Sequence, residues 1–428
     1  MSHAAALAGL WRGAVPRLSF LPALEAGLGL FLLLLFSNAL IAPLLADPAA
    51  PDSTVLRLLW PPVYLASVGL IALHPVRVWR TTLRAWPVLL LAALTMISAA
   101  WSLDPGTTLR RSLAVVMTAV FGLWLASRFS WRDLIRLVAC MFGILAFGSL
   151  IAGVVFPGFG VMNEVHVGAW KGLWWEKNTL GAMMAWAALA FCAAAAAAPK
   201  AAERRVWVCF IGLAVLLVML STSKTALLAT MVCVAGPAGI ALARRGFGFA
   251  ALAIFMLLLG VASLIGVLLV GPGVVLEALG RDATLTGRTE IWGVLTGQIA
   301  ERPLTGYGYG VFWEVEDGPA FWVRQQTAWP VPTAHNAWLE TALSIGVPGA
   351  VFAFVIVLSG LAISMRRLFS GLSAYWALPF LTSWLVVSLS ESNLLQQNGL
   401  VWLLLSATLA KLLSDRGIQE TRLSTPAR

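Results

Sequence analysis

The sequence predicts an all-α polytopic membrane protein, and three observations predict it. The chain of 428 residues is 60% hydrophobic and only 11% charged, whereas soluble domains carry about 25% charged residues. Apolar runs about 20 residues long, enough to cross a bilayer as helices, recur along the chain. The alternating apolar and polar strands of membrane β-barrels do not occur in it.

We expect about twelve spanning helices in a single integral membrane domain that covers residues 1–428. They are predicted at 26–45, 57–73, 84–101, 112–127, 135–156, 179–198, 206–221, 225–242, 248–271, 338–362, 374–390 and 398–413. The prolines at 61, 62 and 237 interrupt two of them, which neighbouring helices tolerate when they satisfy the freed backbone groups. The run of alanines that ends at Ala198 predicts a small-residue packing face.

Lysine and arginine set the orientation. With the N-terminus inside, 19 of the 29 basic residues fall on inner segments and 10 on outer ones. Because short cytoplasmic loops collect Lys and Arg, both termini are predicted in the cytoplasm of a bacterium and the protein in its inner membrane. The net charge of +10 is therefore a topology signal and not evidence of a nucleic-acid partner. The large loop at 272–337, between the ninth and tenth spans, is predicted to be periplasmic.

The large loop begins with a helical pattern. Ile291, Trp292, Leu295 and Ile299 recur at helical spacing, and Arg288 lies on the same stripe. We expect a helix near the membrane surface, ended by the Arg302-Pro303 pair, with Arg288 and Trp292 directed at lipid headgroups. The alternative is an ordinary interfacial anchor, because Arg and Trp favour that depth.

Aromatic residues separated by glycine follow this helix. Tyr307 and Tyr309 alternate with Gly306, Gly308 and Gly310. This pattern suits rings that stack on sugars, and it equally suits an aromatic belt at the membrane interface.

His335 stands at the end of the loop, where the tenth span begins. The positive end of a helix dipole disfavours imidazolium, so the ring is expected to stay neutral and able to accept a proton. The same helix end attracts anions such as diphosphate. A neutral histidine beside cationic side chains is what deprotonation of a sugar hydroxyl against a diphosphate leaving group requires. A capping or interfacial histidine is the alternative.

Other external cations come from the ends of predicted spans. Lys224 lies in a short turn crowded with hydroxyls, Ser221 to Thr225, and Lys177 precedes the sixth span. Snorkelling is the usual explanation for lysines there, but a diphosphate at the bilayer boundary would also meet them. Arg110 and Arg111 are expected to form a second electrostatic shell.

The sequence predicts no cofactor and no metal site. It contains no HExxH, paired-Asp DxD, P-loop or GxSxG motif, and its four cysteines form no CxxC pair. The acidic run from Glu314 to Asp317 is a weak metal candidate beside the simpler reading of a solvated loop. The absence of a nucleotide motif indicates a donor that arrives already activated.

In its order of motifs the chain resembles the O-antigen ligase and polysaccharide polymerase superfamily of bacterial envelopes. No single motif is specific, but together, over about residues 100–410, they are. The matching stretches are Glu176 to Gly181, Ser221 to Thr225, Gly287 to Trp292, Arg302 to Gly308, His335 to Glu340 and Gly346 to Gly349.

The resemblance implies a GT-C-like, metal-independent, inverting glycosyltransferase that takes a glycan from undecaprenyl diphosphate. It implies that His335 is the base and that Arg288 binds the diphosphate. Lys224 stands where the family often has arginine, a change that loses the bidentate fork. Support for the acceptor or the loop is expected from Trp292, Asn336, Tyr307 and Tyr309.

Two functions follow from this resemblance, and a third belongs to a different class of protein. The leading one is an O-antigen ligase that transfers glycan to the lipid A-core oligosaccharide. The alternative is an O-antigen or exopolysaccharide polymerase with the same donor and a growing glycan as acceptor. A lipid-linked glycan transporter is the distant alternative, although the sequence lacks the inverted repeat and mid-span charges expected of one.

Overall fold

The computed structural model describes residues 21–45, 54–164, 166–252, 255–256, 288–315, 318–327 and 331–415. In these ranges it is helical, with one isolated β-bridge between Val161 and Trp170. The helices of the first half are α2 (Leu21–Phe36), α3 (Ile41–Leu45), α4 (Thr54–Ala72), α5 (Pro75–Arg84), α6 (Trp86–Ile97), the 3-10 helix η1 (Ser98–Trp101), α7 (Pro105–Arg128), α8 (Trp131–Val155), α9 (Pro157–Gly160) and α10 (Lys177–Ala197). Those of the second half are α11 (Ala201–Leu220), α12 (Lys224–Ala243), α15 (Arg288–Glu301), α16 (Pro319–Thr327), α17 (Ala337–Arg366), α18 (Ser373–Ser388) and α19 (Leu400–Ser414).

By length and composition, six described helices could cross a membrane. They are α4, α7, α8, α10, α12 and α17, and a seventh span results if the bent pair α5 and α6 is counted as one. The shorter helices α2 and α19 are also apolar. The polytopic helical class is therefore confirmed, whereas the predicted number of twelve is not. The predicted ninth span, at 248–271, lies almost wholly outside the described residues.

Close helix contacts form the core. Gly122 of α7 lies against α19, because an added Cβ there would come within 2.4 Å of Ser406 Oγ. Farther along the same pair, Trp402 Nε1 donates to the carbonyl of Val115 at 3.1 Å. Helix α10 packs against α8, α11 and α12, and its alanines at 193, 194 and 197 are buried, as the alanine run predicts.

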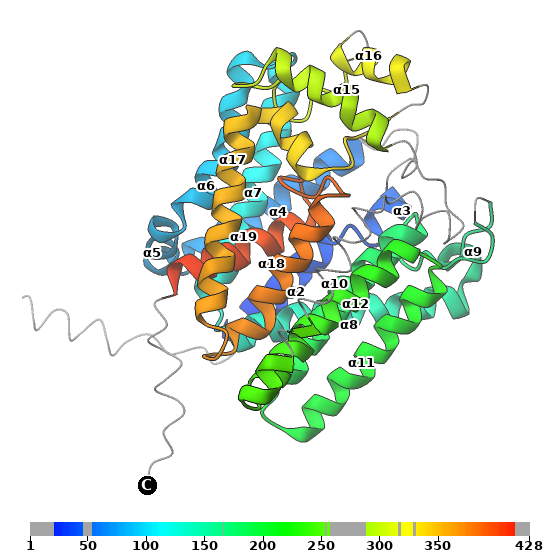
Figure 1. Cartoon of the computed structure of the whole chain (residues 1–428), viewed down its shortest axis with the longest axis vertical. Coiled ribbons are helices and arrows are strands. Elements are labelled where there is room, and N and C mark those ends of the chain that lie inside the picture. Colours follow the sequence, from blue (N-terminus) through cyan, green and yellow to red (C-terminus); the bar gives the residue numbers. More distant parts are fainter. Residues whose placement is uncertain are drawn as a thin grey trace, which may run out of the picture.

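Figure 1 shows how the loop elements sit on this bundle. Helices α15 and α16, drawn in yellow-green and yellow, lie together at the top, beyond the end of α17. Helices α10, α11 and α12 run together on another side of the molecule. The described part of the large loop is thus a folded cap over one end of the helices.

Helix α17 is broken at Ile345 and Gly346. Gly346 adopts φ 78° and ψ 167°, and Pro348 has no N–H to donate. The break frees the carbonyls of Leu343 and Ser344 and the N–H of Val347, and buried groups of this kind require other partners.

The segment from Pro303 to Gly308 supplies those partners. Tyr307 N donates to Leu343 O at 2.7 Å, Gly308 N donates to Ser344 O at 3.2 Å, and Val347 N donates to Pro303 O at 2.7 Å. We call this exchange of three backbone hydrogen bonds the backbone clamp. The glycine-rich segment is therefore built for close backbone contact with α17.

The same segment is held on its other side by the start of α7. Leu103 N donates to Tyr307 O at 3.1 Å, and Thr108 Oγ1 donates to Tyr309 O at 3.0 Å. Trp101 Nε1 donates to Thr305 O at 2.8 Å. Residues 303–309 thus join α7 to α17.

Replacing Gly346 with alanine is expected to destabilise the protein by about 3 kcal/mol, because the positive φ strains any side chain. Its Cβ would also lie 2.3 Å from the carbonyl oxygen of Leu304. Gly293 is the matched control: it lies in α15 with no atom within 4 Å of an added Cβ. There alanine should stabilise by up to about 1 kcal/mol. Thermal unfolding in detergent measures both, and equal unfolding temperatures for the two variants would contradict the clamp.

Candidate functional site

His335 lies directly before α17 and is not its cap. Asn336 caps the helix: its Oδ1 accepts from Trp338 N at 2.9 Å and from Leu339 N at 3.1 Å. Asn336 Nδ2 also donates to Leu389 O at 3.3 Å, which ties this turn to the end of α18. The capping alternative for His335 is therefore excluded, and its imidazole makes no hydrogen bond within the described part of the chain.

The backbone before His335 is fixed by two side chains. Trp292 Nε1 of α15 donates to Ala334 O at 2.9 Å, and Glu340 Oε2 of α17 accepts from Ala334 N at 2.9 Å. Glu340 also accepts from Trp313 Nε1 at 2.9 Å. His335 itself has φ 47°, in the left-handed region. Non-glycine residues held there cost free energy and often occur at functional sites.

Arg288 begins α15 and reaches the connection between α18 and α19. Its Nη1 donates to Ser390 O at 2.7 Å, and its Nη2 lies 3.6 Å from Glu391 Oε1. Residues 257–287, which lead into Arg288, lie outside the described residues. The structure thus brings Arg288 to a loop more than one hundred residues later in the chain.

Arg288 and His335 are electrostatic neighbours. Burial lowers the pKa of His335 below its usual 6.5, and the positive charge of Arg288 lowers the pKa further. Both effects disfavour imidazolium. The lowered pKa favours the neutral imidazole, the form that can accept a proton.

Lys177 and Lys224 form a second cluster at the starts of α10 and α12. Lys177 Nζ donates to Thr222 Oγ1 at 3.3 Å, and Ser223 Oγ caps α12 by accepting from Ala226 N at 3.4 Å. Thr222 has φ 52°. Near the start of α10, an added Cβ on Gly181 would lie 2.6 Å from Ala226 Cβ of α12, so the N-termini of α10 and α12 lie close together. Two helix N-termini and the ammonium of Lys177 favour an anion there.

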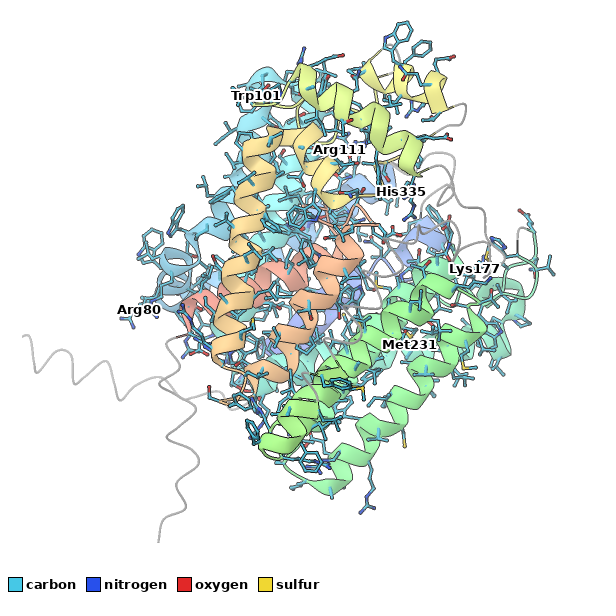
Figure 2. The ribbon with its side chains drawn as sticks, in the orientation of Figure 1. Arg80, Trp101, Arg111, Lys177, Met231 and His335 are labelled. Atoms are coloured by element: carbon cyan, nitrogen blue, oxygen red, sulfur yellow. The ribbon has the colours of Figure 1, made fainter. Side chains whose placement is uncertain are left out.

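The two clusters are separate in this structure. Within the described ranges, no hydrogen bond or ion pair connects Lys177 or Lys224 with Arg288 or His335. Figure 2 shows His335 and Lys177 on the same side of the molecule, one beneath the loop helices and one at the end of α10. A ligand held by both clusters would have to bridge them.

Arg111 is bound to the large loop. Its Nη1 donates to the carbonyl of Gly310 and lies 3.2 Å from Glu314 Oε1. Arg110 is an electrostatic neighbour of Asp104, whose pKa is lowered mainly by hydrogen bonds from Thr107. Arg111 therefore holds the loop to α7 in this structure.

Tyr307 and Tyr309 are buried. Tyr307 Oη donates to Gln298 O at 2.9 Å, and burial with Glu301 nearby raises the pKa of Tyr307 to about 12. Tyr309 Oη donates to Leu395 O at 2.6 Å, and burial also raises its pKa. Both rings are thus placed to support the loop, with little surface open to a sugar.

Helix α15 does not lie with its apolar face on the membrane. Ile291 and Leu295 are fully buried in a cluster with Tyr307, Phe312 and Val323, and Trp292 packs against that cluster. Arg288 and Trp292 contact backbone carbonyls of the protein, so the expectation that they face lipid headgroups was wrong, because the loop has a hydrophobic core of its own. The position of α15 near the membrane surface stays a prediction. Helical periodicity shows that one face is covered, but not by what.

Sequence reasoning missed the connection between α18 and α19. Ser390 and Glu391 contact Arg288, and Leu395 accepts from Tyr309. The available signal was a polar run, residues 388–398, between two apolar helices. Glu340 was noticed only as part of a motif, although it holds the segment before His335.

The described residues contain no group of three His, Cys, Asp or Glu side chains that could hold a metal ion. Glu314 is paired with Arg111. The rest of that acidic run, Glu316 and Asp317, lies outside the described residues.

Replacing Arg288 with glutamine is expected to raise the pKa of His335, because one of the two causes that lower it is removed. The pH dependence of carbethoxylation at His335, followed by peptide mass spectrometry, measures this pKa. The midpoint should lie below 6.5 in the parent protein and higher in the Arg288→Gln variant. Arg302→Gln, on the far end of α15, is the control and should leave the midpoint unchanged. An unchanged midpoint in Arg288→Gln would refute the coupling.

The O-Antigen ligase family matches residues 208–354, a segment that contains Lys224, Arg288 and His335. The exopolysaccharide production protein ExoQ of Rhizobium meliloti (strain 1021) is 27% identical over 292 residues. That alignment covers 64% of this chain and 64% of the relative, slightly less than two thirds of its length. Together these similarities support the resemblance to the O-antigen ligase and polysaccharide polymerase superfamily that the sequence motifs indicate.

Proposed function

We propose that the protein is a metal-independent, inverting glycosyltransferase that moves a glycan from undecaprenyl diphosphate to an acceptor sugar at the periplasmic face of the inner membrane. The leading acceptor is the lipid A-core oligosaccharide, which makes the enzyme an O-antigen ligase. The observation that carries this proposal is the pairing of a neutral His335 with Arg288 in the segment that matches the family.

In the proposed reaction, an acceptor hydroxyl attacks the anomeric carbon of the donor glycan. The bond between that carbon and the diphosphate oxygen breaks, and the configuration inverts in one displacement. His335 accepts the hydroxyl proton through a ring nitrogen that has no partner among the described residues. Undecaprenyl diphosphate leaves with the bonding electron pair.

Arg288 is proposed to bind the leaving diphosphate. A guanidinium has five N–H donors, and the carbonyl of Ser390 uses one of them at 2.7 Å. Glu391 lies at 3.6 Å, longer than a hydrogen bond. The remaining donors suit bidentate contact with a phosphate. The carbonyl of Ser390 meanwhile fixes the direction of the side chain.

Lys177 and Lys224 are proposed to hold the diphosphate from its other side. Their ammonium groups stand at the starts of two helices, where backbone N–H groups and helix dipoles also favour anions. Such a donor would bridge the two clusters, and its own negative charge would draw them together. Arg110 is proposed to add to the positive field at this face.

A second candidate is a polymerase that extends an O-antigen or an exopolysaccharide with the same donor. One observation favours it: the name of the relative in Rhizobium meliloti refers to exopolysaccharide production. Lysine at 224 is compatible with either function. The two functions differ only in the acceptor. Purified protein offered a lipid-linked donor with lipid A-core, or with a second lipid-linked glycan, would separate them by the product formed. Donor translocation across vesicles without product would instead support a transporter.

Replacing His335 with asparagine is expected to lower the transfer rate by about 10²- to 10⁴-fold, the usual contribution of a general base. Asparagine tolerates the left-handed backbone at this position, so the loop should keep its fold. His166→Asn is the matched control, because His166 is an exposed outer histidine that also has a positive φ. Transfer by His335→Asn at the parent rate would refute the base.

Replacing Lys224 with glutamine is expected to raise the KM for the lipid-linked donor by about tenfold, the loss of one charge-assisted phosphate contact. Lys224→Arg keeps the charge and should stay within a few-fold of the parent. Lys171→Gln, a nearby outer lysine, is the control. If Lys224→Gln and Lys171→Gln change the donor KM equally, Lys224 has no specific role.

A further inference from the structure

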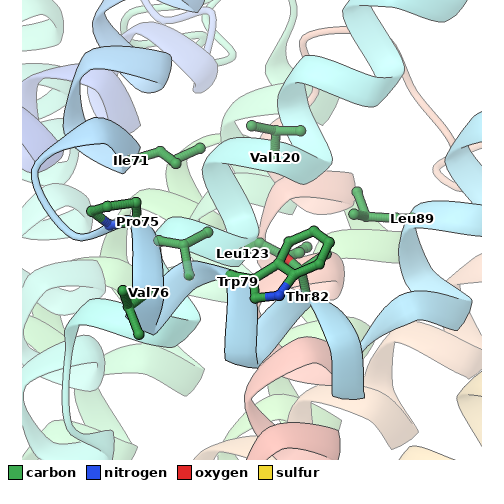
Figure 3. A pocket seen from close by; sticks show the side chains of 9 residues that line it. Ile71, Pro75, Val76, Trp79, Thr82, Leu89, Val120 and Leu123 are labelled. Atoms are coloured by element: carbon green, nitrogen blue, oxygen red, sulfur yellow. The ribbon is translucent and has the colours of Figure 1, made fainter.

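An apolar groove of about 590 Å³ lies between α4, α5, α6 and α7. Its walls, drawn in Figure 3, consist almost entirely of hydrocarbon side chains, with the hydroxyl of Thr82 among them. Its principal lining residues are Ile71, Pro75, Trp79, Leu89, Val120 and Leu123.

Helix α5 carries two opposite faces at this groove. Pro75, Trp79 and Thr82 line the groove. The three arginines of the helix, at 77, 80 and 84, fall on the other side by helical spacing. Arg84 Nη1 donates a hydrogen bond to Ser414 O at 2.9 Å. Arg77 and Arg80 are exposed and form no ion pair in the described ranges, and Figure 2 shows Arg80 directed away from the protein.

The position of α5 suits a membrane interface. It joins α4 to α6 and bends by 83° from the continuation of α6. It is short and basic on one side, with Val76, Trp79 and Leu83 exposed on the other. Helices of this kind lie in the headgroup layer with their apolar face toward the acyl chains.

The groove is distant from the candidate site. Thr108, near the start of α7, contacts Tyr309 of the loop, whereas Val120 and Leu123 of the same helix line the groove. At 1.5 Å per residue, Val120 and Leu123 lie roughly 18 to 22 Å from Thr108 along α7. The groove is therefore not part of the proposed transfer site.

We propose that this groove binds an anionic glycerophospholipid of the cytoplasmic leaflet. One acyl chain lies against the apolar walls. Val76 also lines the groove, on the flank of α5 that adjoins Arg80 by helical spacing, so the phosphate lies at this edge, where the long side chains of Arg80 and Arg77 turn toward it. The charge of the two arginines complements an anionic headgroup and gives no preference for a zwitterionic one. In a bilayer, an apolar groove beside an interfacial helix faces the lipid acyl chains. An acyl chain of a lipid in that leaflet is therefore its natural occupant.

The test uses the full chain, purified in detergent and stripped of lipid. Native mass spectrometry compares the occupancy of phosphatidylglycerol with that of phosphatidylcholine offered at equal concentration. The parent protein should prefer phosphatidylglycerol by about tenfold or more, and the variant R77Q/R80Q should lose this preference. R204Q/R205Q, which removes the same charge from the start of α11, is the control and should keep it.

A second variant tests the groove itself. Thr82→Phe fills part of the groove from α5 and should lower the occupancy of both lipids. The ratio of bound phosphatidylglycerol to bound phosphatidylcholine should stay unchanged. Four results would overturn the proposal: no preference in the parent, a preference that survives in R77Q/R80Q, an equal loss in the control, or undecaprenyl phosphate binding more tightly than phosphatidylglycerol. A dimer that Thr82→Phe dissociates, with lipid binding unchanged, would assign the groove to a second copy.

Discussion

The broken helix α17 is the constraint on which the site depends. A spanning helix normally satisfies its own backbone, and here three groups at the break are satisfied by residues 303–308 instead. The first two turns of α17 can therefore turn away from the spanning part and carry Asn336 and Glu340 into the loop. Those two side chains fix the residues on either side of His335. The break in α17 thus determines where His335 lies.

Much of this fold follows from apolar runs and charge. The sequence predicts the polytopic class, the packing face of α10 and the helix that begins at Arg288, because each depends on local composition or on the period of apolar residues. The clamp is not, because it joins carbonyls at 343 and 344 to N–H groups at 307 and 308. Backbone N–H and C=O groups are the same for nearly all residue types, so the sequence does not show which of them pair. The aromatic residues between these glycines suited sugar stacking or an aromatic belt, whereas in the structure the glycines allow two backbones to approach closely.

In the candidate site, too, the sequence predicts the local features and not the tertiary contacts. His335 could be selected because the chain has only four histidines, and Arg288 because it lies on the apolar stripe of a predicted helix. Their proximity could not, since it arises from a loop core of Ile291, Leu295, Tyr307 and Phe312 and from a contact with Ser390. The electrostatic consequence, a histidine held neutral by burial and by a neighbouring cation, follows from that proximity. Residue type identified His335 and Arg288 as candidates, whereas tertiary packing determines the pKa of His335 and the partners of Arg288.

The contact between Tyr309 and Leu395 has a consequence for biogenesis. The loop is synthesised well before the connection between α18 and α19, yet Tyr309 and Arg288 both find their partners there. At about 5–20 residues per second, the ribosome needs roughly 5–20 s to pass from one to the other. During that interval the loop lacks its contacts with Ser390 and Leu395. The nascent chain therefore completes this face only after the connection between α18 and α19 has been synthesised.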